Sequence, residues 1–311
     1  MLIVVLSKAI LVLGHFRSGT SLVARIINDL GAYIENDLFK PDENNQEGYW
    51  ESKELRDINK RVLRLVGAGE FEPPAIHSGW ERNKILDPLH LQAERFIERM
   101  NHHDFWVCKH PATTLTLPFW LMHLPAERYF VISIRNPLSV TSSMRSWGFD
   151  DLTSSHLWES YNLSAIVNTL NEKRLFIFYD DFIYDSNSIS KQIANFLIVD
   201  DVSPTGKSYS SALTAWWVNA EELFISQEIH WGSKILYFLL TESKSNPIVI
   251  EKLSQQIASS GNLGTLQVWP NDLSQSKYLY RQLKEARAQY ASLASHPFVK
   301  FGLNIKRYLR I

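Results

Sequence analysis

The chain has 311 residues, of which 45% are hydrophobic and 21% charged, and its formal net charge is -1. This composition is typical of a folded protein with one large or two modest domains, and it excludes a wholly disordered chain. The balance of 32 Lys and Arg against 33 Asp and Glu argues against nucleic-acid binding by bulk positive charge. A single cysteine, Cys108, excludes an intramolecular disulfide framework and a zinc site made of several cysteines.

The N-terminal apolar stretch, residues 2–13, is interrupted by Ser7 and Lys8 and is too short to cross a bilayer. No basic region precedes it, so it lacks the pattern of a secretory signal. We therefore expect a cytoplasmic protein with no transmembrane segment.

Short apolar runs alternate with helical patterns over the first 200 residues, which predicts an α/β fold with a parallel sheet. Each run is continuous, as in strands that are buried on both faces, and a turn or helix-start signal follows it. Helical spacing of apolar residues follows the first and the last of these runs. We expect strands at residues 9–13, 105–108, 129–134 and 175–179, and helices at 22–30 and 189–197.

The second half of the chain carries fewer signals. Residues 199–211 are polar and contain Pro204 and Gly206, so we interpret them as a linker. We expect an α/β core over residues 1–200 and a mainly helical part over 201–311, which can pack on the same domain. Its expected helices are 213–225, 247–258 and 278–293, and a basic cluster ends the chain, with Lys300, Lys306, Arg307 and Arg310. We interpret this cluster as a solvated helix face.

The loop after the first expected strand has the most informative sequence. A buried strand, a loop bounded by glycines and a helix follow one another directly, which aims backbone N–H groups and a positive helix end at one point. This arrangement suits a phosphate group. The candidate binding residues are Gly14, His15, Phe16, Arg17, Ser18, Gly19, Thr20 and Ser21.

The same loop differs from that of a nucleotide kinase or an ATPase. The glycines have the G-x-x-x-x-G spacing, but Thr20 stands where such enzymes have the lysine that contacts the β and γ phosphates. The only cation in the loop is Arg17. Two alternative functions stay open. One is a P-loop nucleotide kinase, with Asp180 as its one candidate magnesium ligand, and the other is an inactive nucleotide-binding module.

A second phosphate motif follows the third expected strand. Arg135 stands at the carboxyl end of that strand, where α/β sheets bind ligands, and its guanidinium suits a terminal phosphate. Pro137 can begin a helix, which would bring Ser143 round toward the same ligand.

These two motifs resemble those of the sulfotransferases that use 3′-phosphoadenosine 5′-phosphosulfate (PAPS) as the sulfuryl donor. The segment Phe16 to Ser21 resembles the loop that binds the 5′-phosphosulfate, with Phe16 where many members have proline. Arg135 and Ser143 match the motif for the 3′-phosphate, and residues 179–182 resemble a recurring feature of bacterial members. The resemblance covers residues 9–200.

The resemblance implies a fold, a cofactor and a reaction. The fold would be a three-layer α/β sandwich with a central parallel sheet, like that of P-loop NTPases. The enzyme, of bacterial type, would move a sulfuryl group from PAPS to a hydroxyl group, and it would require no metal. Residues 14–21 would bind the 5′-phosphosulfate, and Arg135 with Ser143 would bind the 3′-phosphate. Arg17 would stabilise charge on the leaving bridging oxygen, and Lys109 would neutralise charge in the transition state.

The general base is left open by the sequence. Relatives of cytosolic type place a histidine in a K-T-H-x-P setting, whereas this chain has Lys109, His110 and Pro111, one residue shorter. His110 at a strand end has a suitable ordinary pKa for a base. Glu51 is the second candidate, because other branches of the family use a carboxylate. Glu47 and Asp42, in the same polar loop, are the remaining candidates.

The acceptor is not encoded by any motif. The polar stretch over residues 40–51 is typical of a functional or mobile loop, and its Tyr49 and Trp50 could stack on a sugar or an aromatic ring. We expect a glycan, a lipid or a small metabolite as acceptor, no nucleic-acid partner, and no strongly anionic acceptor. The oligomeric state is not encoded. Four further tryptophans are expected in the core: Trp106, Trp120, Trp147 and Trp158.

Overall fold

The computed structural model describes residues 7–42, 47–73, 79–199, 223, 226, 229–245 and 247–259. All of them belong to one compact unit, Met1–Thr265. The helix expected over 278–293 and the basic C-terminal cluster lie outside the described residues. Asn246, which precedes the helix expected over 247–258, also lies outside the described residues. The same is true of nearly all residues of the linker and of the helix expected over 213–225.

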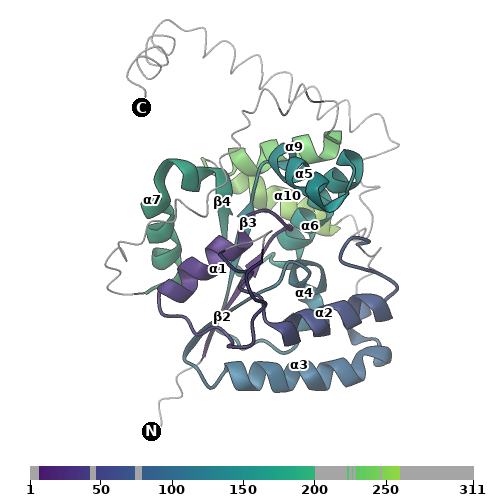
Figure 1. Ribbon diagram of the computed structural model, residues 1–311, viewed down its shortest axis with the longest axis vertical. Coiled ribbons are helices and arrows are strands. Elements are labelled where there is room, and N and C mark those ends of the chain that lie inside the picture. The colour runs from purple at the N-terminus through teal and green to yellow at the C-terminus, as the bar shows by residue number, and fades with distance from the viewer. Residues whose placement is uncertain are drawn as a thin grey trace, which may run out of the picture. The chain divides into compact units, whose positions relative to one another are not determined.

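Four parallel strands form the central sheet, in the order β2-β1-β3-β4 (Figure 1). They are β1 Lys8–Leu13, β2 Phe105–Lys109, β3 Arg128–Ile134 and β4 Lys173–Phe178. β1 lies at the centre, where Val12 pairs with Lys109 on one side and with Val131 on the other. The predicted α/β fold with a parallel sheet is therefore confirmed, and each strand lies within two residues of its predicted bounds.

Helices cover both faces of this sheet (Figure 1). On one face, α1 (Thr20–Asp29) and α7 (Tyr179–Leu197) pack on alternate strand residues such as Ile10 and Val131, because successive strand side chains point to opposite faces. On the other face lie α4 (Thr113–Leu121) and α6 (Asp151–Asn168). The expected three-layer sandwich is thus present.

The remaining described elements surround these layers. They are α2 (Lys53–Leu65), α3 (Asp87–Met100), α5 (Pro137–Met144), α9 (Trp231–Glu242), α10 (Ile248–Ser259) and the short 3-10 helices η1 (Trp80–Arg82), η2 (Lys84–Leu86) and η3 (Arg145–Trp147). Both α9 and α10 contact α6. Within the described part of the chain, no helix combines the length and the apolar character that a bilayer span needs.

Helix boundaries follow local sequence signals. Asn136 caps α5, its side chain accepting a hydrogen bond from the N–H of Leu138, and Pro137 takes the first helical position as expected. Gly31, at a φ of +99°, follows α1 in the left-handed conformation that ends many helices. Tyr179 begins α7 instead of ending β4 as predicted, and α7 has a kink at Asp185.

Several helices were not predicted from the sequence, and α6 shows why. Its apolar periodicity is weak because one side of this helix buries polar residues. Ser154, Ser155, Glu159 and Asn162 are all fully buried in α6. A pattern of apolar residues alone could not find a helix that packs through hydrogen bonds.

Candidate active site

The two phosphate motifs meet at the point where the strand order of the sheet reverses. From β1 the chain crosses to β2 on one side, and β3 then lies on the other side of β1. The loop after β1 and the segment after β3 therefore diverge around a crevice at the carboxyl ends of the strands. Open parallel sheets bind their ligands at such a switch point.

Two glycines give the loop after β1 its shape. Gly14 has a φ of +139°, and a Cβ atom there would lie 2.5 Å from the carbonyl oxygen of Ser133. Gly19 has a φ of +85°, and a Cβ atom would overlap the ring of Tyr179. Any larger residue would push the loop away from β3 or from α7, so both positions need glycine.

The loop leads into the N-terminus of α1, which is open to an anion. Gly19 precedes the helix and provides no side-chain cap, and the first turn carries no acidic residue. The hydroxyl of Ser18 is buried and has no hydrogen-bond partner among the described residues. Free N–H groups, a positive helix end and an unpaired hydroxyl together suit a phosphate or sulfate group.

Arg17 connects the two motifs. Its Nε donates a hydrogen bond to Ser143 Oγ at 2.8 Å, and its guanidinium lies 5.6 Å from the centre of the Trp147 ring. Arg135 in turn donates to the carbonyl oxygen of Arg17 at 2.9 Å. Arg17 has a φ of 63°, a conformation that costs free energy for any residue other than glycine and that clusters at functional sites. Residues 17, 135 and 143 therefore lie together although more than a hundred residues separate the first from the others.

Arg135 is a buried cation. It is 5% exposed, its guanidinium lies 4.6 Å from the centre of the Tyr179 ring, and burial lowers its pKa. The indole N–H of Trp158 on α6 holds the Arg135 carbonyl at 3.0 Å. A guanidinium kept in a low-dielectric crevice favours an anionic ligand beside it.

Lys109, at the end of β2, is fixed by three acceptors. Its ammonium donates to Glu51 Oε1 at 2.6 Å, to the carbonyl of Tyr49 at 3.0 Å and to Ser21 Oγ at 3.1 Å. Burial lowers the pKa of Lys109, while the Glu51 carboxylate opposes this shift. Because Ser21 belongs to the first turn of α1, the Lys109 charge lies next to the helix end that receives the anion.

His110 is held by a network that determines its tautomer. Asn59 Oδ1 accepts from the indole N–H of Trp120 at 2.7 Å, which identifies the other end of the Asn59 amide as the donor. This amide donates to His110 Nδ1 at 3.2 Å. The proton of the neutral ring therefore lies on Nε2. Burial and the neighbouring cation Lys109 lower the pKa of His110 well below its usual range.

The protonated face of His110 points toward two carboxylates. Its Nε2 lies 3.3 Å from Glu70 Oε1 and 3.9 Å from Glu51 Oε2. Burial raises the pKa of Glu70, against the opposing charges of Lys60 and Arg56. Sequence reasoning missed Glu70, because it lies in a short connection after α2 with no motif around it.

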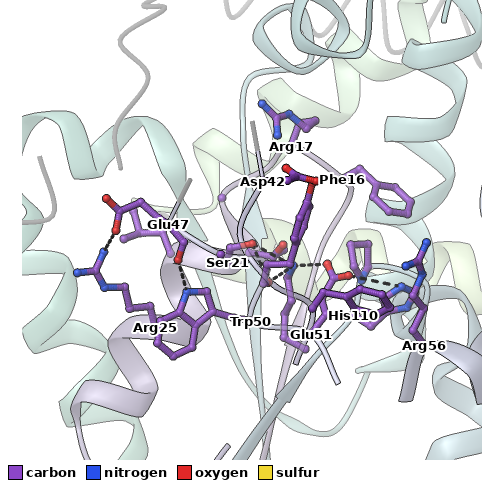
Figure 2. A pocket seen from close by; sticks show the side chains of 18 of the residues that line it. Phe16, Arg17, Ser21, Arg25, Asp42, Glu47, Trp50, Glu51, Arg56 and His110 are labelled. Atoms are coloured by element: carbon purple, nitrogen blue, oxygen red, sulfur yellow. Dashed lines mark hydrogen bonds and ion pairs between the residues drawn. The ribbon is translucent and has the colours of Figure 1, made fainter. Parts of the chain in front are cut away.

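Many of these residues line one cavity of about 770 Å³, a volume in the usual range for a small-molecule site. Figure 2 shows the labelled side chains around it. Seven Lys and Arg side chains and four carboxylates line it, although the whole chain is nearly neutral. The cations are Arg17, Arg25, Lys40, Arg56, Lys60, Lys109 and Arg135.

The candidate binding residues differ in how they meet this cavity. The candidates that line it include Phe16, Arg17, Gly19, Thr20, Ser21, Arg135, Glu51, Lys109 and His110. Those that do not line it include Gly14, His15, Ser18 and Ser143. His15 turns its ring into the core against Tyr161, with 5.0 Å between the ring centres. Its Nδ1 bonds the carbonyl of Phe16, and burial lowers the pKa of His15 to about 4.

The polar loop after α1 forms one wall of the cavity. Tyr49 donates to both carboxylate oxygens of Asp42 at 2.8 Å, and Trp50 donates to the carbonyl of Glu47 at 3.0 Å. The carboxylate of Glu47 pairs with Arg25 at 2.5 Å. Asp42 and Glu47 are therefore partnered at the exposed rim, whereas Glu51 is 8% exposed.

Three of the four tryptophans expected in the core are there: Trp106, Trp120 and Trp158 are at most 1% exposed. The prediction was wrong for Trp147, which lines the cavity and contacts Phe16 at 5.9 Å between ring centres. Trp147 lies in the short helix η3 after α5, where it covers Arg17 instead of a face of the sheet.

No protein-family model and no curated protein matches the chain. Among solved structures, it is similar to a sulfotransferase of Alicyclobacillus acidocaldarius, with 15% identity and a TM-score of 0.40 over 80% of this chain and 96% of that one. The sulfotransferase domain of the olefin synthase of Synechococcus has 18% identity and a TM-score of 0.38 over 63% of this chain and 74% of that one. A sulfotransferase of Mycobacterium avium has 12% identity and a TM-score of 0.40 over 64% and 66%. These three solved structures are sulfotransferases, the family whose two phosphate motifs the sequence resembles.

Proposed function

We propose that the chain is a sulfotransferase that moves a sulfuryl group from PAPS to a hydroxyl of a glycan, a lipid or a small metabolite. The observation that carries this proposal is the bonded group of Arg17, Ser143 and Arg135 at the switch point of the sheet. A donor with phosphate groups at both its 5′ and 3′ positions needs two anion sites on adjacent strand ends, and this group joins two such sites.

The donor is bound in two parts on this proposal. The N–H groups of residues 19–21, the Ser18 hydroxyl and the N-terminus of α1 hold the 5′-phosphosulfate. Arg135 and Ser143 hold the 3′-phosphate, since a buried guanidinium and a hydroxyl suit a terminal phosphate. Arg17, Lys109 and the helix end supply positive charge near the bridging oxygen, so the reaction requires no metal.

The transfer is a single in-line displacement. The acceptor oxygen forms a bond to sulfur while the bond from sulfur to the bridging phosphate oxygen breaks, which releases adenosine 3′,5′-bisphosphate. The acceptor proton passes to a base. Arg17 stabilises the charge that grows on the leaving oxygen, and Lys109 the charge on the sulfuryl oxygens.

Among the candidates for this base, we favour Glu51 over His110. His110 Nδ1 already accepts from Asn59 and Nε2 carries the ring proton, so neither nitrogen is ready to take another. Glu51 lines the cavity beside Lys109, and only one of its oxygens bonds this lysine. His110 then acts as a positioning residue, whose Nε2 proton faces the carboxylates of Glu51 and Glu70.

A group of aromatic side chains lines the cavity beside Arg17. Phe16, Phe71 and Trp147 form a connected group, with 5.1 Å between the first two ring centres and 6.5 Å between the last two. Aromatic faces of this kind pack on sugar rings and on aromatic alcohols. This supports a ring-bearing acceptor of modest charge.

A nucleotide kinase is not favoured, because Asp180, its one candidate magnesium ligand, is used elsewhere. Its Oδ2 accepts from the N–H of Asn136 at 3.1 Å and from the hydroxyl of Tyr237 at 3.2 Å, and Asp180 does not line the cavity.

The experiment that tests the proposal is transfer of labelled sulfate from PAPS to a panel of sugars, lipids and phenols in the presence of EDTA. The proposal requires transfer to at least one class. Adenosine 3′,5′-bisphosphate, the product, should inhibit that transfer. Phosphate transfer from ATP with magnesium and none from PAPS would support the kinase instead.

A further inference from the structure

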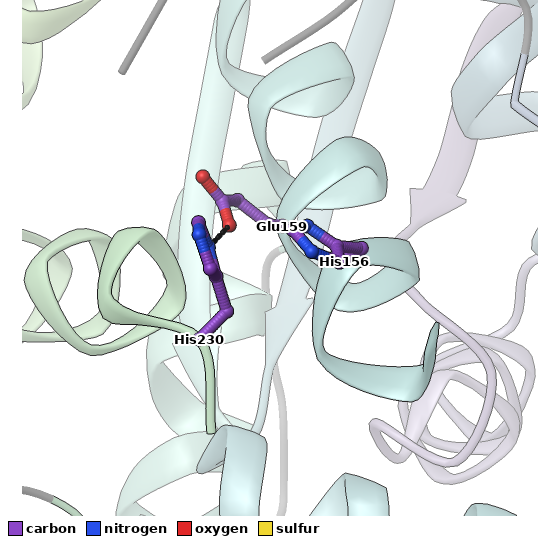
Figure 3. A group of neighbouring side chains, drawn as sticks. All are labelled: His156, Glu159 and His230. Atoms are coloured by element: carbon purple, nitrogen blue, oxygen red, sulfur yellow. Dashed lines mark hydrogen bonds and ion pairs between the residues drawn. The ribbon is translucent and has the colours of Figure 1, made fainter. Parts of the chain in front are cut away.

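Three side chains of metal-ligand type gather where α6 meets the start of α9 (Figure 3). His156 and Glu159 are three residues apart on α6, and His230 is the residue that caps α9. One ligand atom from each lies within 4.8 Å of the other two. None of the three lines the cavity described above.

The carboxylate of Glu159 needs a positive partner. Glu159 is fully buried, and its Oε2 lies 2.9 Å from His230 Nδ1 and accepts a hydrogen bond from Ser233 Oγ at 3.3 Å. Its Oε1 is buried and has no hydrogen-bond partner among the described residues. A buried carboxylate with one unpaired oxygen is costly, and a cation bound to this carboxylate would neutralise its charge.

The backbone leaves room for that oxygen. A Cβ atom at Gly232, in the first turn of α9, would overlap Glu159 Oε1 and the rest of the carboxylate. Gly232 therefore allows α9 to approach α6 closely while Oε1 stays unpaired. The imidazole rings of His156 and His230 lie close together, with 4.3 Å between their ring centres.

We propose that His156, Glu159 and His230 form a binding site for a divalent transition metal, and that Zn²⁺ fits it best. Two imidazole nitrogens and one carboxylate oxygen are the donors that Zn²⁺ takes when three protein ligands leave a fourth position to water. His156 is exposed, so the site has an entry path and room for that water.

The surrounding hydrogen bonds hold these ligands in place. Ser155 Oγ accepts from the backbone N–H of His230 at 2.9 Å and lies 2.9 Å from Ser233 Oγ, which in turn bonds Glu159. Supporting contacts of this kind orient ligands and strengthen metal binding. A metal here would clamp α6 to α9. Trp158 of α6 bonds the carbonyl of Arg135, and Tyr237 of α9 bonds Asp180.

The competing account is an ion pair without metal, in which protonated His230 alone compensates Glu159. The two accounts differ at His156, which is needed only for metal binding. Because His156 is exposed, His156→Ala should fold normally, and His102→Ala offers a matched control at another exposed histidine.

The test is calorimetric titration of the untagged full chain, stripped with EDTA and dialysed, with ZnCl₂ and separately with MgCl₂. We expect one Zn²⁺ per chain and no Mg²⁺. Loss of a supporting contact weakens metal sites about 10–100-fold, so loss of a ligand in His156→Ala should cost about 100-fold or more. His102→Ala should bind Zn²⁺ as the unaltered chain does.

Co²⁺ gives an independent readout, because its visible absorption reports tetrahedral coordination. The proposal predicts this absorption for the unaltered chain and for His102→Ala, and its loss in His156→Ala. Absence of Zn²⁺ binding at micromolar concentration would overturn the proposal. So would unchanged Zn²⁺ affinity in a folded His156→Ala, and either result would leave the sulfotransferase proposal untouched.

Discussion

The two ends of the cavity are built differently. At the proposed donor end, the chemistry comes from short segments that directly follow strands: the loop after β1 and the residues after β3. At the proposed acceptor end, it comes from side chains brought together across the fold: Glu51 after the polar loop, Glu70 after α2, and His110 held by Asn59. A phosphate site made of backbone and strand ends is therefore visible in the local sequence, whereas a proton-transfer site built from distant side chains is not.

The largest effect expected concerns the acceptor end. Glu51→Gln should lower kcat by about 10²–10⁴-fold, because it removes the proposed base while it keeps the shape of the side chain. His110→Asn should cost less, since His110 acts through the carboxylates that it faces. Steady-state kinetics of both variants, with Glu47→Gln as the control at the exposed rim, measures the difference. The reverse ranking would make His110 the base.

The pH dependence of kcat/KM sharpens the same assignment. The pKa of His110 is held well below its usual range, so the ring stays neutral as the pH falls through about 6.5. Activity should therefore show no loss from His110 protonation near this pH. A limb near pH 6.5 that disappears in His110→Asn would contradict the lowered pKa of His110.

At the donor end, Arg17→Ala should lower kcat by about 10²–10³-fold, as does loss of one donor to a developing oxyanion. The affinity for the donor should fall less, because charge on the bridging oxygen grows toward the transition state. Arg25→Ala is the matched control, since Arg25 lines the cavity but pairs with Glu47. An effect of Arg17→Ala on the donor KM alone would limit Arg17 to binding.

The free energy of unfolding should depend on pH through His15, which is buried below the loop. The pKa of His15 is about 4 in the folded chain and about 6.5 when unfolded, so the unfolded chain binds the extra proton between these values. Stability should therefore fall by about 3 kcal/mol as the pH drops from about 6.5 to 4. Urea unfolding at several pH values measures this, and His15→Asn should reduce the slope while the exposed His102→Asn leaves it unchanged. An unaltered slope in His15→Asn would assign the effect to other groups.

The smallest change that we expect is in the selectivity between two nucleotides. Arg135→Ala should weaken the binding of adenosine 3′,5′-bisphosphate by about 1.5–3 kcal/mol, the strength of a charged hydrogen bond. It should weaken the binding of AMP much less. Arg128→Ala, at the other end of β3 and paired with Glu172, is the control. Calorimetry with both nucleotides measures the selectivity. Equal losses for the two would show that Arg135 only supports the carbonyl of Arg17.

The sequence predicted the strands and the glycine loop, but not the elements that depend on contacts between distant segments. The four strands were predicted within two residues because both faces of each strand are apolar, and the glycine loop because its conformation needs particular residues. The helix α6 was missed, since its buried residues include Ser155 and Glu159.

At the site, the tautomer of His110 depends on Asn59 and Trp120, which lie far from it in sequence and carry no motif. Glu70 and Trp147 likewise reach the cavity only through the packing of α2 and η3. Such residues are identified by contacts, and contacts between distant segments are not visible in a single sequence.

The proposed donor site binds a nucleotide with phosphates at both the 3′ and the 5′ position, without a metal. Calorimetry of the unaltered chain with adenosine 3′,5′-bisphosphate in EDTA tests this most directly, with ATP and magnesium as the comparison. We predict binding of the bisphosphate that EDTA does not weaken, and weaker or no binding of ATP with magnesium. Bisphosphate binding that appears only with magnesium, or tighter binding of ATP with magnesium, would contradict the account.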